Sequence, residues 1–379
     1  IKIIAVSALS KSKDRGVDLT AYEWEDDPIV LAKWDDIDVF VELIGGESGQ
    51  AKKATEEAIK HGKHVVTANK AMLAIHGQEL ASAAENSGVN LRFEAAVAGG
   101  IPVIKTLTES LAGNNITRIM GVMNGTCNYI LTRMEDTGLA YEEIFEEANQ
   151  LGFLEADPNL DVGGIDAAHK LVLLSSIAYG TQVDFNGAIL EGIGRITIED
   201  IKAASEMGYR IKLLGVSSLS DSGLSQTMRP CLVPLTSPLA QLNGGTNMII
   251  IEGDAVGQIV LRGAGAGEGP TASAVIADIL DIARGINIPV FGQPANSLIK
   301  VPAISTSVEN SFYLRLNLKD EAGILAKVSA ALANVGISID RIRQEGHEKD
   351  AAPVIIVTHP TDRDTLNKAI SEIEETSAA

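Results

Sequence analysis

Short apolar runs alternate with longer helical patterns along the first third of the chain. The runs with the period of a strand lie at 3–7, 39–44, 64–67 and 90–94. Two helical patterns accompany them, one at 77–86 and one at 49–61, where the residues on one face are Ala51, Ala54, Ala58 and Ile59. Strands that alternate with helices in this way are typical of βαβ units, so we expect a parallel sheet covered by helices.

The middle of the chain, from 102 to about 303, mixes both kinds of pattern. Its strand-like runs lie at 116–123, 228–233, 248–253 and 258–262. Its helical patterns lie at 103–111, 141–150, 165–178 and 271–284. The last of these carries an apolar face that should pack back onto the first domain, formed by Val275, Ile276, Ile279, Leu280 and Ile282. We expect an α+β sheet domain here that carries the substrate site and a dimer contact.

A polar segment at 303–309 precedes a third region. The patterns of this region are a strand at 311–318, a helix at 324–335, strands at 338–344 and 353–358, and a helix at 362–374. The first strand and helix are joined by Asp320-Glu-Ala-Gly323, and this opening resembles an ACT domain, a small ferredoxin-type module that binds a regulatory ligand. Three domains are therefore predicted. The first is 1–101, and about 271–303 completes it; the second is 102–303, and the ACT-like third is 311–379.

Composition and charge narrow the class of protein. An apolar content of 45% with only 4% aromatic residues suits an α/β enzyme, and 379 residues are enough for two or three domains. The net charge of −19 argues against nucleic acid and anionic membranes as partners. The cysteines, Cys127 and Cys231, provide neither a disulfide framework nor a metal cluster. No apolar run could span a bilayer and no targeting segment is visible, so we expect a cytoplasmic enzyme.

The stretch from Glu155 to Lys170 is the strongest candidate for chemistry. Its first half is rich in Gly, Pro and acids, which predicts a loop. From Ile165 the pattern becomes helical, so Asp166 and Lys170 stand one turn apart on the same face. Glu155 can fold back onto that face from the loop. An amine held between carboxylates in this way can donate a proton and hold a small charged substrate.

Taken alone, an Asp–Lys pair at this spacing is usually an exposed salt bridge worth a few tenths of a kcal/mol. The loop favours a functional site, because a stretch with Asp157-Pro158 and Gly163-Gly164 is costly to order unless its shape is used. The wider stretch from Ala148 to Lys170 closely resembles the signature of homoserine dehydrogenases. The resemblance implies a Rossmann-like nucleotide-binding domain and the reversible NAD(P)H-dependent reduction of aspartate 4-semialdehyde to homoserine. This reaction belongs to the synthesis of threonine, methionine and isoleucine.

The charge of such a substrate suggests a role for each residue of the stretch. Its ammonium group needs carboxylates, which Glu155 and Asp166 supply. As hydride reaches the aldehyde carbon, the oxygen becomes alkoxide-like, and Lys170 is the predicted acid that protonates it. Asp166, one turn away, would also orient Lys170.

Strand ends of the first domain carry sequences that suit a cofactor, because ligands of open α/β sheets lie at the carboxyl ends of the strands. The first such sequence is Ile44-Gly45-Gly46. The second ends in Asn69-Lys70; a lysine at a helix start is usually only solvated, but the resemblance implies that this one faces the cofactor and binds phosphate or substrate charge. The resemblance further implies that Gly152 and Gly267 let the backbone approach the nicotinamide ribose.

The segment that follows the first strand should decide between NADP and NAD. NAD-dependent enzymes usually place Asp or Glu there, to bind the ribose hydroxyls. Here the segment from Ser7 to Arg15 offers hydroxyls and cations and has no carboxylate before Asp14. We therefore expect NADP, with NAD possible, although an ordinary basic loop has the same composition.

The segment from Glu94 to Ile101 is small and apolar with one acid, and by itself it would be interpreted as a turn. A strand that ends in Gly-Gly frees carbonyl oxygens, which suit a hard cation. Homoserine dehydrogenases are similar here, which implies a monovalent cation such as sodium. Its ligands would be Glu94 and the carbonyls of Val97, Gly99 and Ile101, and its role would be to tie the two domains together.

Two other hypotheses remain open from the residues alone. Cys127, in Asn124-Gly-Thr-Cys-Asn128, could be the nucleophile of a thiol-dependent semialdehyde dehydrogenase, although buried packing is the simpler interpretation. The GxGxxG fingerprint is also absent, so we expect roughly thirty residues to precede Ile1, the size of a βαβ unit, and a final strand to follow the last helix. A chain without that loop could be inactive and retain only amino-acid binding at the ACT-like domain.

Overall fold

The N-terminal region is built on the parallel sheet that the alternating pattern predicts. The computed structural model describes residues 1–304, 309–344 and 351–376. Strands β3 (Val39–Glu42), β4 (His64–Thr67) and β5 (Leu91–Arg92) pair in parallel in that order. A separate parallel pair, β1 (Ala5–Val6) and β2 (Glu23–Trp24), precedes the short helix α1 (Pro28–Leu31).

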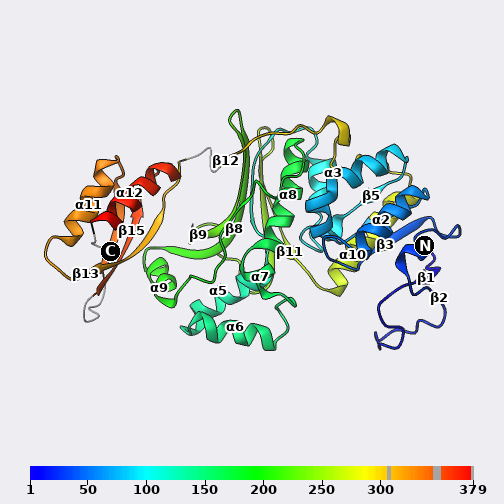
Figure 1. Cartoon of the computed structure of the whole chain (residues 1–379), viewed down its shortest axis with the longest axis horizontal. Helices are drawn as coiled ribbons and strands as arrows, with labels where there is room; N and C mark the ends of the chain where they lie inside the picture. The colour runs from blue at the N-terminus through cyan, green and yellow to red at the C-terminus, as the bar shows by residue number, and fades with distance from the viewer. Residues whose placement is uncertain (305–308, 345–350, 377–379) are drawn as a thin grey trace.

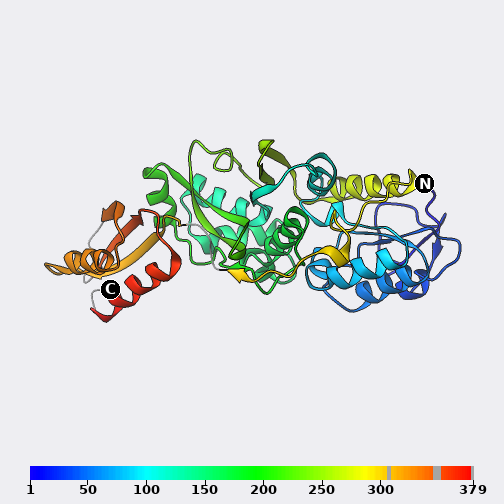
Figure 2. The same ribbon diagram turned by 90° about the horizontal axis from the view of Figure 1, so that it is seen from above.

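Helices cover both faces of this sheet (Figure 2). α2 (Gln50–Lys60) buries the predicted face of Ala51, Ala54, Ala58 and Ile59. α3 (Lys70–Asn86) begins seven residues before the predicted helix at 77–86, because Asn69 caps it by accepting a hydrogen bond from the backbone N–H of Met72. On the other face, α10 (Glu268–Ala283) returns from the middle of the chain and packs Ala274 and Val275 against β4.

The apolar face predicted for α10 is partly wrong. Ile276 and Leu280 are 44% and 37% exposed, whereas the acids Asp278 and Asp281 of the same helix are buried. Both acids form ion pairs with Lys105 of the next region. The helix is therefore rotated from the orientation that its apolar residues alone would give, because it must bring two carboxylates to this lysine.

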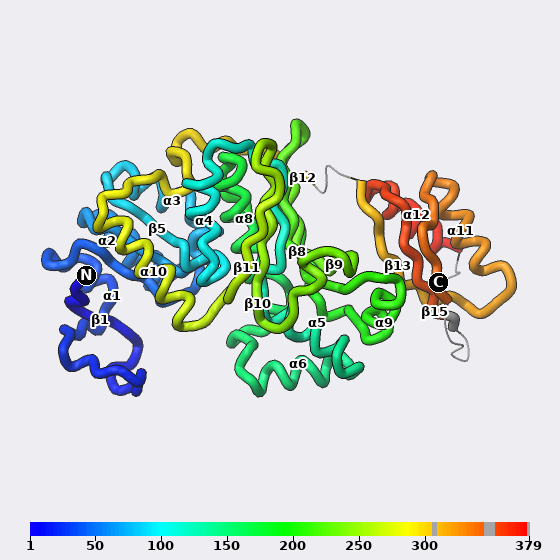
Figure 3. The backbone as a smooth tube through the Cα atoms, turned by 180° about the vertical axis from the view of Figure 1, so that it is seen from behind, coloured from blue at the N-terminus to red at the C-terminus, as the bar shows by residue number. Residues whose placement is uncertain are grey.

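The central region is a seven-stranded sheet, which stands between the two ends of the molecule (Figures 1 and 3). The strand order is β11-β10-β6-β8-β9-β12, and β7 also pairs with β9. In chain order the strands are β6 (Ile116–Val122), β7 (Ile189–Leu190), β8 (Tyr209–Ser220), β9 (Gly223–Pro234), β10 (Thr246–Gly253), β11 (Gly257–Ala264) and β12 (Ala303–Ile304). β8, which the pattern did not predict, pairs with β9 along its full length.

Helices of the central region carry the signature stretch. In chain order they are α4 (Val103–Lys105) with a π-helical turn at Thr106–Ser110, α5 (Gly125–Thr137), α6 (Tyr141–Gln150), α7 (Pro158–Val162), α8 (Ile165–Tyr179) and α9 (Ile198–Glu206). α5 was not predicted, and α7 lies inside the predicted loop. α8 packs between the sheet and α3, so nearly all of it is buried. Within the described ranges, no helix is long and apolar enough to cross a membrane.

The C-terminal region has the predicted ACT-like arrangement. An antiparallel sheet of order β13-β15-β14 packs against two helices. Its elements are β13 (Tyr313–Lys319), α11 (Ile324–Asn334), β14 (Ile339–Gln344), β15 (Ala351–Thr358) and α12 (Arg363–Glu375). Part of the predicted polar segment, 305–308, and the last residues of the predicted domain, 377–379, lie outside the described residues.

This C-terminal region docks onto α9 of the central region through polar contacts. The hydroxyl of Tyr313 donates to Oδ1 of Asp200 at 2.6 Å, and Arg315 pairs with Oδ2 of the same carboxylate. Arg315 also donates to the hydroxyl of Thr197 at 2.9 Å, and Arg343 pairs with Glu206. The contact therefore centres on the two ends of one short helix.

Candidate active site

Asp166 and Lys170 form a buried ion pair in the first turns of α8. Oδ2 of Asp166 lies 2.8 Å from Nζ of Lys170, and the two side chains are only 6% and 9% exposed. Nζ of Lys170 also donates to the carbonyl of Met123 at 2.8 Å. Because both side chains are buried, this pair is not an exposed surface salt bridge. Burial of two charges is costly unless other interactions compensate, and the carbonyl of Met123 provides one.

Lys70 completes this cluster from the neighbouring region. It is the first residue of α3, and its Nζ lies 3.0 Å from Oδ1 of Asp166 and 3.9 Å from Oε1 of Glu155. The amine that lies between the two carboxylates is thus Lys70, whereas the sequence suggested Lys170. The structure brings Lys70, Glu155, Asp166 and Lys170 together, and we refer to these four residues as the Asp166 cluster.

Asn124 and Asp161, which the sequence did not single out as site residues, orient the cluster through hydrogen bonds. The amide of Asn124 donates to Asp161 at 2.9 Å and to Asp166 at 3.0 Å. The other oxygen of Asp161 accepts the backbone N–H of Glu155 at 2.9 Å, and the side chain of Asp161 is buried. Asp161 was visible as an acid in the signature stretch, and Asn124 only as a neighbour of Cys127, and neither pattern indicates a contact across the fold.

The charges of the cluster shift the pKa values of its members. Burial alone would raise the pKa of Asp166, but Lys170 and Lys70 outweigh it and hold that pKa well below its ordinary range. Burial would lower the pKa of Lys70, but Asp166 and Glu155 raise it. The pKa of the half-exposed Glu155 is raised, mainly by burial. Asp166 is therefore a permanent anion, and Glu155 is the carboxylate whose charge responds to its surroundings.

The thiol hypothesis finds no activated nucleophile. Cys127 is fully buried in α5, its Sγ contacts the carbonyl of Asp161 at 3.2 Å, and burial raises the pKa of the thiol well above its ordinary value. His169 is not a base for it, since its ring packs on Phe185 with 4.5 Å between ring centroids. Burial lowers the pKa of His169 to about 4. Cys127 is a packing residue.

The strand end at β3 is an ordered turn. The carboxylate of Glu42 accepts the backbone N–H groups of Ile44 and Gly45 at 2.7 and 3.1 Å, and the amide of Asn69 donates to the carbonyl of Gly46 at 2.8 Å. Gly45 and Gly46 have φ of +83°, and a Cβ on Gly45 would meet no atom within 4 Å. The predicted sequence Ile44-Gly45-Gly46 is thus an ordered, exposed turn with open space beside Gly45, and its contact with the cofactor stays a prediction.

Gly152 and Gly267, the other glycines predicted at the cofactor, also have backbone conformations that favour glycine. Gly152 follows α6 with φ of +74°, and a Cβ there would point into open space. Gly267 precedes α10 with φ of +112°, and the nearest atom to an added Cβ would be in Pro270 at 3.6 Å. Both leave room for a ligand, and their role remains a prediction.

The segment predicted to bind a cation joins the N-terminal and central regions. The buried carboxylate of Glu94 accepts the backbone N–H groups of Ile104 and Lys105, each at 2.9 Å, and burial raises its pKa to about 7. The carbonyl of Ile101 accepts the N–H of Val103 at 2.8 Å. A Cβ on Gly99 would lie 2.7 Å from the backbone of Gly265, so the segment is pressed against the end of β11. Oxygens with one partner keep a lone pair, so these residues fit a cation as well as a turn.

Comparison with known proteins identifies the family. A family model of the homoserine dehydrogenase NAD-binding domain matches residues 1–94, one of homoserine dehydrogenase matches 102–280, and one of the ACT domain matches 312–377. A homoserine dehydrogenase of Neisseria gonorrhoeae is 43% identical, over 99% of this chain and 87% of that protein. The chain belongs to the homoserine dehydrogenase family. A homoserine dehydrogenase of Pseudomonas aeruginosa is 44% identical, over 89% of this chain and 80% of that protein.

Solved structures of homoserine dehydrogenases agree with this assignment. One from Thiobacillus denitrificans has a TM-score of 0.89 at 42% identity, and the match covers 94% of this chain and 83% of that one. A hyperthermophilic archaeal homoserine dehydrogenase in complex with NADPH has a TM-score of 0.61 at 28% identity, over 70% of this chain and 77% of that one. The predicted fold and the predicted activity, an oxidoreductase that interconverts homoserine and aspartate 4-semialdehyde, are confirmed.

Proposed function

We propose that homoserine dehydrogenase chemistry takes place at the Asp166 cluster, with Lys170 as the proton donor to the substrate oxygen. The observation that carries this assignment is the use of both oxygens of Asp166, one by Lys170 and one by Lys70. An ammonium group has three N–H donors, and Lys170 uses two of them, on Asp166 and on the carbonyl of Met123. The third is left for the substrate.

A nicotinamide held beside the cluster would supply or accept the hydride. In the reductive direction, Lys170 transfers its third proton to the aldehyde oxygen as the carbon–hydrogen bond forms, which leaves a neutral amine and a hydroxyl group. In the oxidative direction, the neutral amine of Lys170 takes the proton of the homoserine hydroxyl. Asp166 stays ionised in both directions and holds Lys170 in place.

Glu155 and Lys70 suit the two charged groups at the other end of the substrate. In homoserine the ammonium and carboxylate share one carbon atom, and Oε1 of Glu155 lies 3.9 Å from Nζ of Lys70. We assign the ammonium to Glu155 with Asp166, and the carboxylate to Lys70. On binding, the half-exposed ion pair between Glu155 and Lys70 would be replaced by two new ion pairs, one from each residue to the substrate. Asp166 would stay buried.

NADP is the proposed cofactor, on the support of the segment after β1. Asp14, its first carboxylate, accepts the backbone N–H of Gly16 at 2.8 Å and so is engaged within the segment. Arg15 donates to the carbonyls of Lys13 and Ser10 at 2.9 and 2.8 Å, which orders a loop of cations and hydroxyls. The 2′-phosphate of NADP would be attracted by the cations of this loop, whereas the 2′-hydroxyl of NAD would have no free carboxylate there as a hydrogen-bond acceptor.

Absorbance of the reduced nicotinamide in the presence of homoserine tests both proposals, with NADP and NAD offered separately. We expect homoserine-dependent reduction that is faster with NADP. Lys13→Gln should raise the KM for NADP several-fold and leave that for NAD unchanged, and Lys33→Gln, which removes the same charge outside the loop, should change neither. Equal KM values for the two cofactors in the unaltered enzyme would refute the preference for NADP.

We further propose a monovalent cation such as sodium at Glu94 and the carbonyls of Val97, Gly99 and Ile101. Two observations support it: a buried carboxylate with a raised pKa, and a non-glycine residue, Ala98, held at φ of 58° within the same segment. Sodium should then raise the melting temperature more than tetramethylammonium chloride at equal ionic strength, and Glu94→Gln should abolish the difference.

The remaining expectations concern regulation, assembly and location. We propose that the ACT domain binds an amino-acid effector such as threonine beside the turn Asp320–Gly323, that the enzyme is a homodimer or a higher homo-oligomer, and that it is cytoplasmic. Gly323, at φ of +90° before α11, supports the first proposal because it lets the backbone of that turn approach a ligand. Titration with threonine and light scattering test the effector and the assembly.

A further inference from the structure

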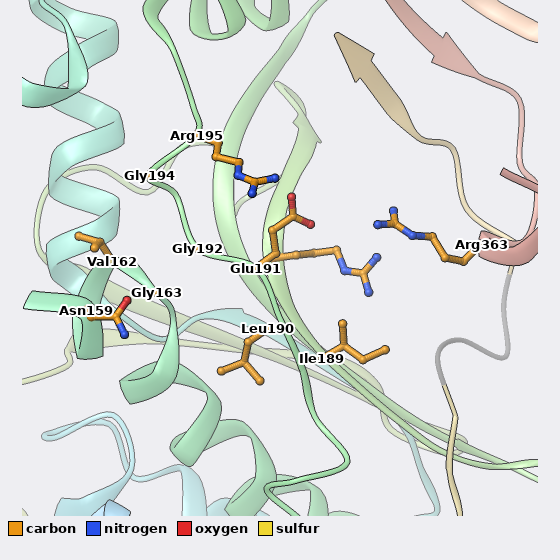
Figure 4. A pocket seen from close by; sticks show the side chains of 11 residues that line it. Asn159, Val162, Gly163, Ile189, Leu190, Glu191, Gly192, Gly194, Arg195 and Arg363 are labelled. Carbon is orange, nitrogen blue, oxygen red and sulfur yellow. The ribbon is translucent and has the colours of Figure 1, made fainter. Parts of the chain in front are cut away.

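A cavity lies between the substrate domain and the ACT domain (Figure 4). Its volume is about 600 Å³, and its lining includes neither Lys70 nor Lys170. Residues 189–194 and α7 form the walls on the side of the substrate domain, and Arg363, the first residue of α12, lies on the side of the ACT domain. The cavity is therefore bounded by two domains.

Three arginines line this cavity against a single carboxylate, so the site has an excess of two positive charges. They are Arg195, Arg229 and Arg363, and the carboxylate is Glu191. Figure 4 shows the polar ends of Arg195, Glu191 and Arg363 directed into a shared space. Burial and the nearby charge of Arg363 lower the pKa of Arg229, so the two guanidinium groups repel each other across a partly dry space.

These arginines also differ from the others at this domain boundary in their lack of an ion-pair partner among the described residues. Among the described residues, none of the three takes part in an ion pair, and Nε of Arg229 is buried without a hydrogen-bond partner. Arg315, by comparison, pairs with Asp200, and Arg341 donates to the carbonyl of Met207. A buried donor of a charged group is costly without a partner, so a ligand that brings acceptor atoms to Nε of Arg229 would be stabilised here.

The cavity is also distinct from the turn where an ACT effector is expected. Arg363 lies over the ring of Phe312, 5.5 Å from its centroid, and Phe312 immediately precedes β13. The turn Asp320–Gly323 follows the other end of that strand. The two places are therefore separated by the length of β13.

We propose that this cavity binds a small dianion, a dicarboxylate or a phosphate-bearing molecule, which joins Arg363 of the ACT domain to Arg195 and Arg229 of the substrate domain. Guanidinium groups bind planar carboxylate and phosphate groups through paired hydrogen bonds, and two negative charges match the excess positive charge. The volume admits an organic molecule larger than free phosphate. A bound dianion fastens the two domains to each other.

Isothermal titration calorimetry tests this site without any measurement of activity. The probes are inorganic phosphate and succinate, each added at constant ionic strength, and comparison of the two separates phosphate from dicarboxylate chemistry. We expect saturable binding of at least one probe, weakened about tenfold or more by Arg363→Gln and by Arg229→Gln. Lys368→Gln removes the same charge from an exposed position of α12 and should leave binding unchanged. Glu191→Gln should tighten binding about threefold, because it removes the one negative charge.

The outcomes distinguish specific binding in the cavity from nonspecific attraction of anions to the protein. Absence of saturable binding for both probes, or equal weakening by Lys368→Gln and Arg363→Gln, would refute the proposal. If Arg229→Gln fails to fold, as a melting curve will show, the opposite effects expected of Arg363→Gln and Glu191→Gln still decide. Hydrogen exchange then tests the link between domains: the probe should slow exchange in both 189–195 and α12, and protection of only one segment would contradict it.

Discussion

Asp166 and Asp200 occupy equivalent places at the two domain boundaries of this enzyme. Each is a buried carboxylate in the first turn of a helix, α8 or α9, with 5% and 2% of the residue exposed. Each also receives a cation from the neighbouring domain, Lys70 at Asp166 and Arg315 at Asp200.

The two carboxylates differ in what their partners leave free. Oδ2 of Asp200 accepts the N–H of Thr197 at 2.9 Å and pairs with Arg315, and Oδ1 accepts the hydroxyl of Tyr313, so both oxygens are held by partners within the fold. At Asp166, Lys170 keeps an unused donor and Lys70 shares its charge with a half-exposed Glu155. We therefore assign a structural role to Asp200, whose cation holds the ACT domain, and we propose the reaction site at Asp166, where Lys170 has a donor left for the substrate.

The largest expected effect is that of Lys170→Ala on turnover. The variant should lose kcat about 10³-fold while the KM for homoserine changes little, because the proton donor acts in the transition state. Steady-state kinetics in both directions measure this, with Lys368→Ala as the surface control. A fall in kcat matched by an equal loss of substrate affinity would contradict a purely chemical role.

Removal of the cation that pairs with Asp200 should affect the stability of the fold and leave turnover nearly unchanged. Arg315→Gln leaves Asp200 buried without its cation and should lower the free energy of unfolding by about 2 kcal/mol, while kcat stays within about twofold. Urea unfolding measures this. Lys319→Gln, which removes the same charge from the exposed end of β13, is the matched control. If Arg315→Gln left unfolding unchanged, the comparison between the two carboxylates would fail.

Glu155→Gln should have a smaller effect, confined to substrate binding. We expect the KM for homoserine to rise about tenfold with kcat nearly unchanged, because the amide cannot neutralise the substrate ammonium. Glu142→Gln, on the exposed face of α6, should have no effect. An unchanged KM in Glu155→Gln would remove this residue from the site.

The last prediction concerns pH and His169, and its effect appears only below neutral pH. Burial lowers the pKa of His169 to about 4, below the unfolded value of about 6.5, so the unfolded chain binds more protons between these values. This residue therefore stabilises the fold above pH 6.5, and that contribution is lost as the pH falls toward 4. His169→Gln should flatten the stability curve in this window by up to about 1.4 kcal/mol per pH unit. An unchanged slope between pH 4 and 6.5 would show that His169 titrates normally.

The sequence predicted the parts of the site that depend on local spacing. Asp166 and Lys170 are one helical turn apart, so their contact follows from helix geometry once α8 is recognised. Lys70 and Asn124 reach the same carboxylate from distant parts of the chain, and only the packing of α3 and α5 against α8 brings them there. For this reason the sequence placed Lys70 at the cofactor, as a cation for phosphate or substrate charge, and did not pair it with Asp166.

Apolar periodicity failed where charge determined the orientation of an element. The face of α10 that contacts the rest of the protein includes Asp278 and Asp281, because Lys105 pairs with both. The arginines around the interdomain cavity also escaped notice, since Arg195, Arg229 and Arg363 belong to three separate elements and form no motif. A site of this kind is formed only when the domains pack together, so no local sequence pattern indicates it.

The position of Asp200 has a consequence for how this enzyme can be engineered. One carboxylate both caps α9, together with Thr197, and anchors Tyr313 and Arg315 of the ACT domain. Deletion of the ACT domain would therefore expose this carboxylate and remove two partners of α9. An enzyme shortened at this boundary should keep the fold of its substrate domain only if Asp200 is given new partners.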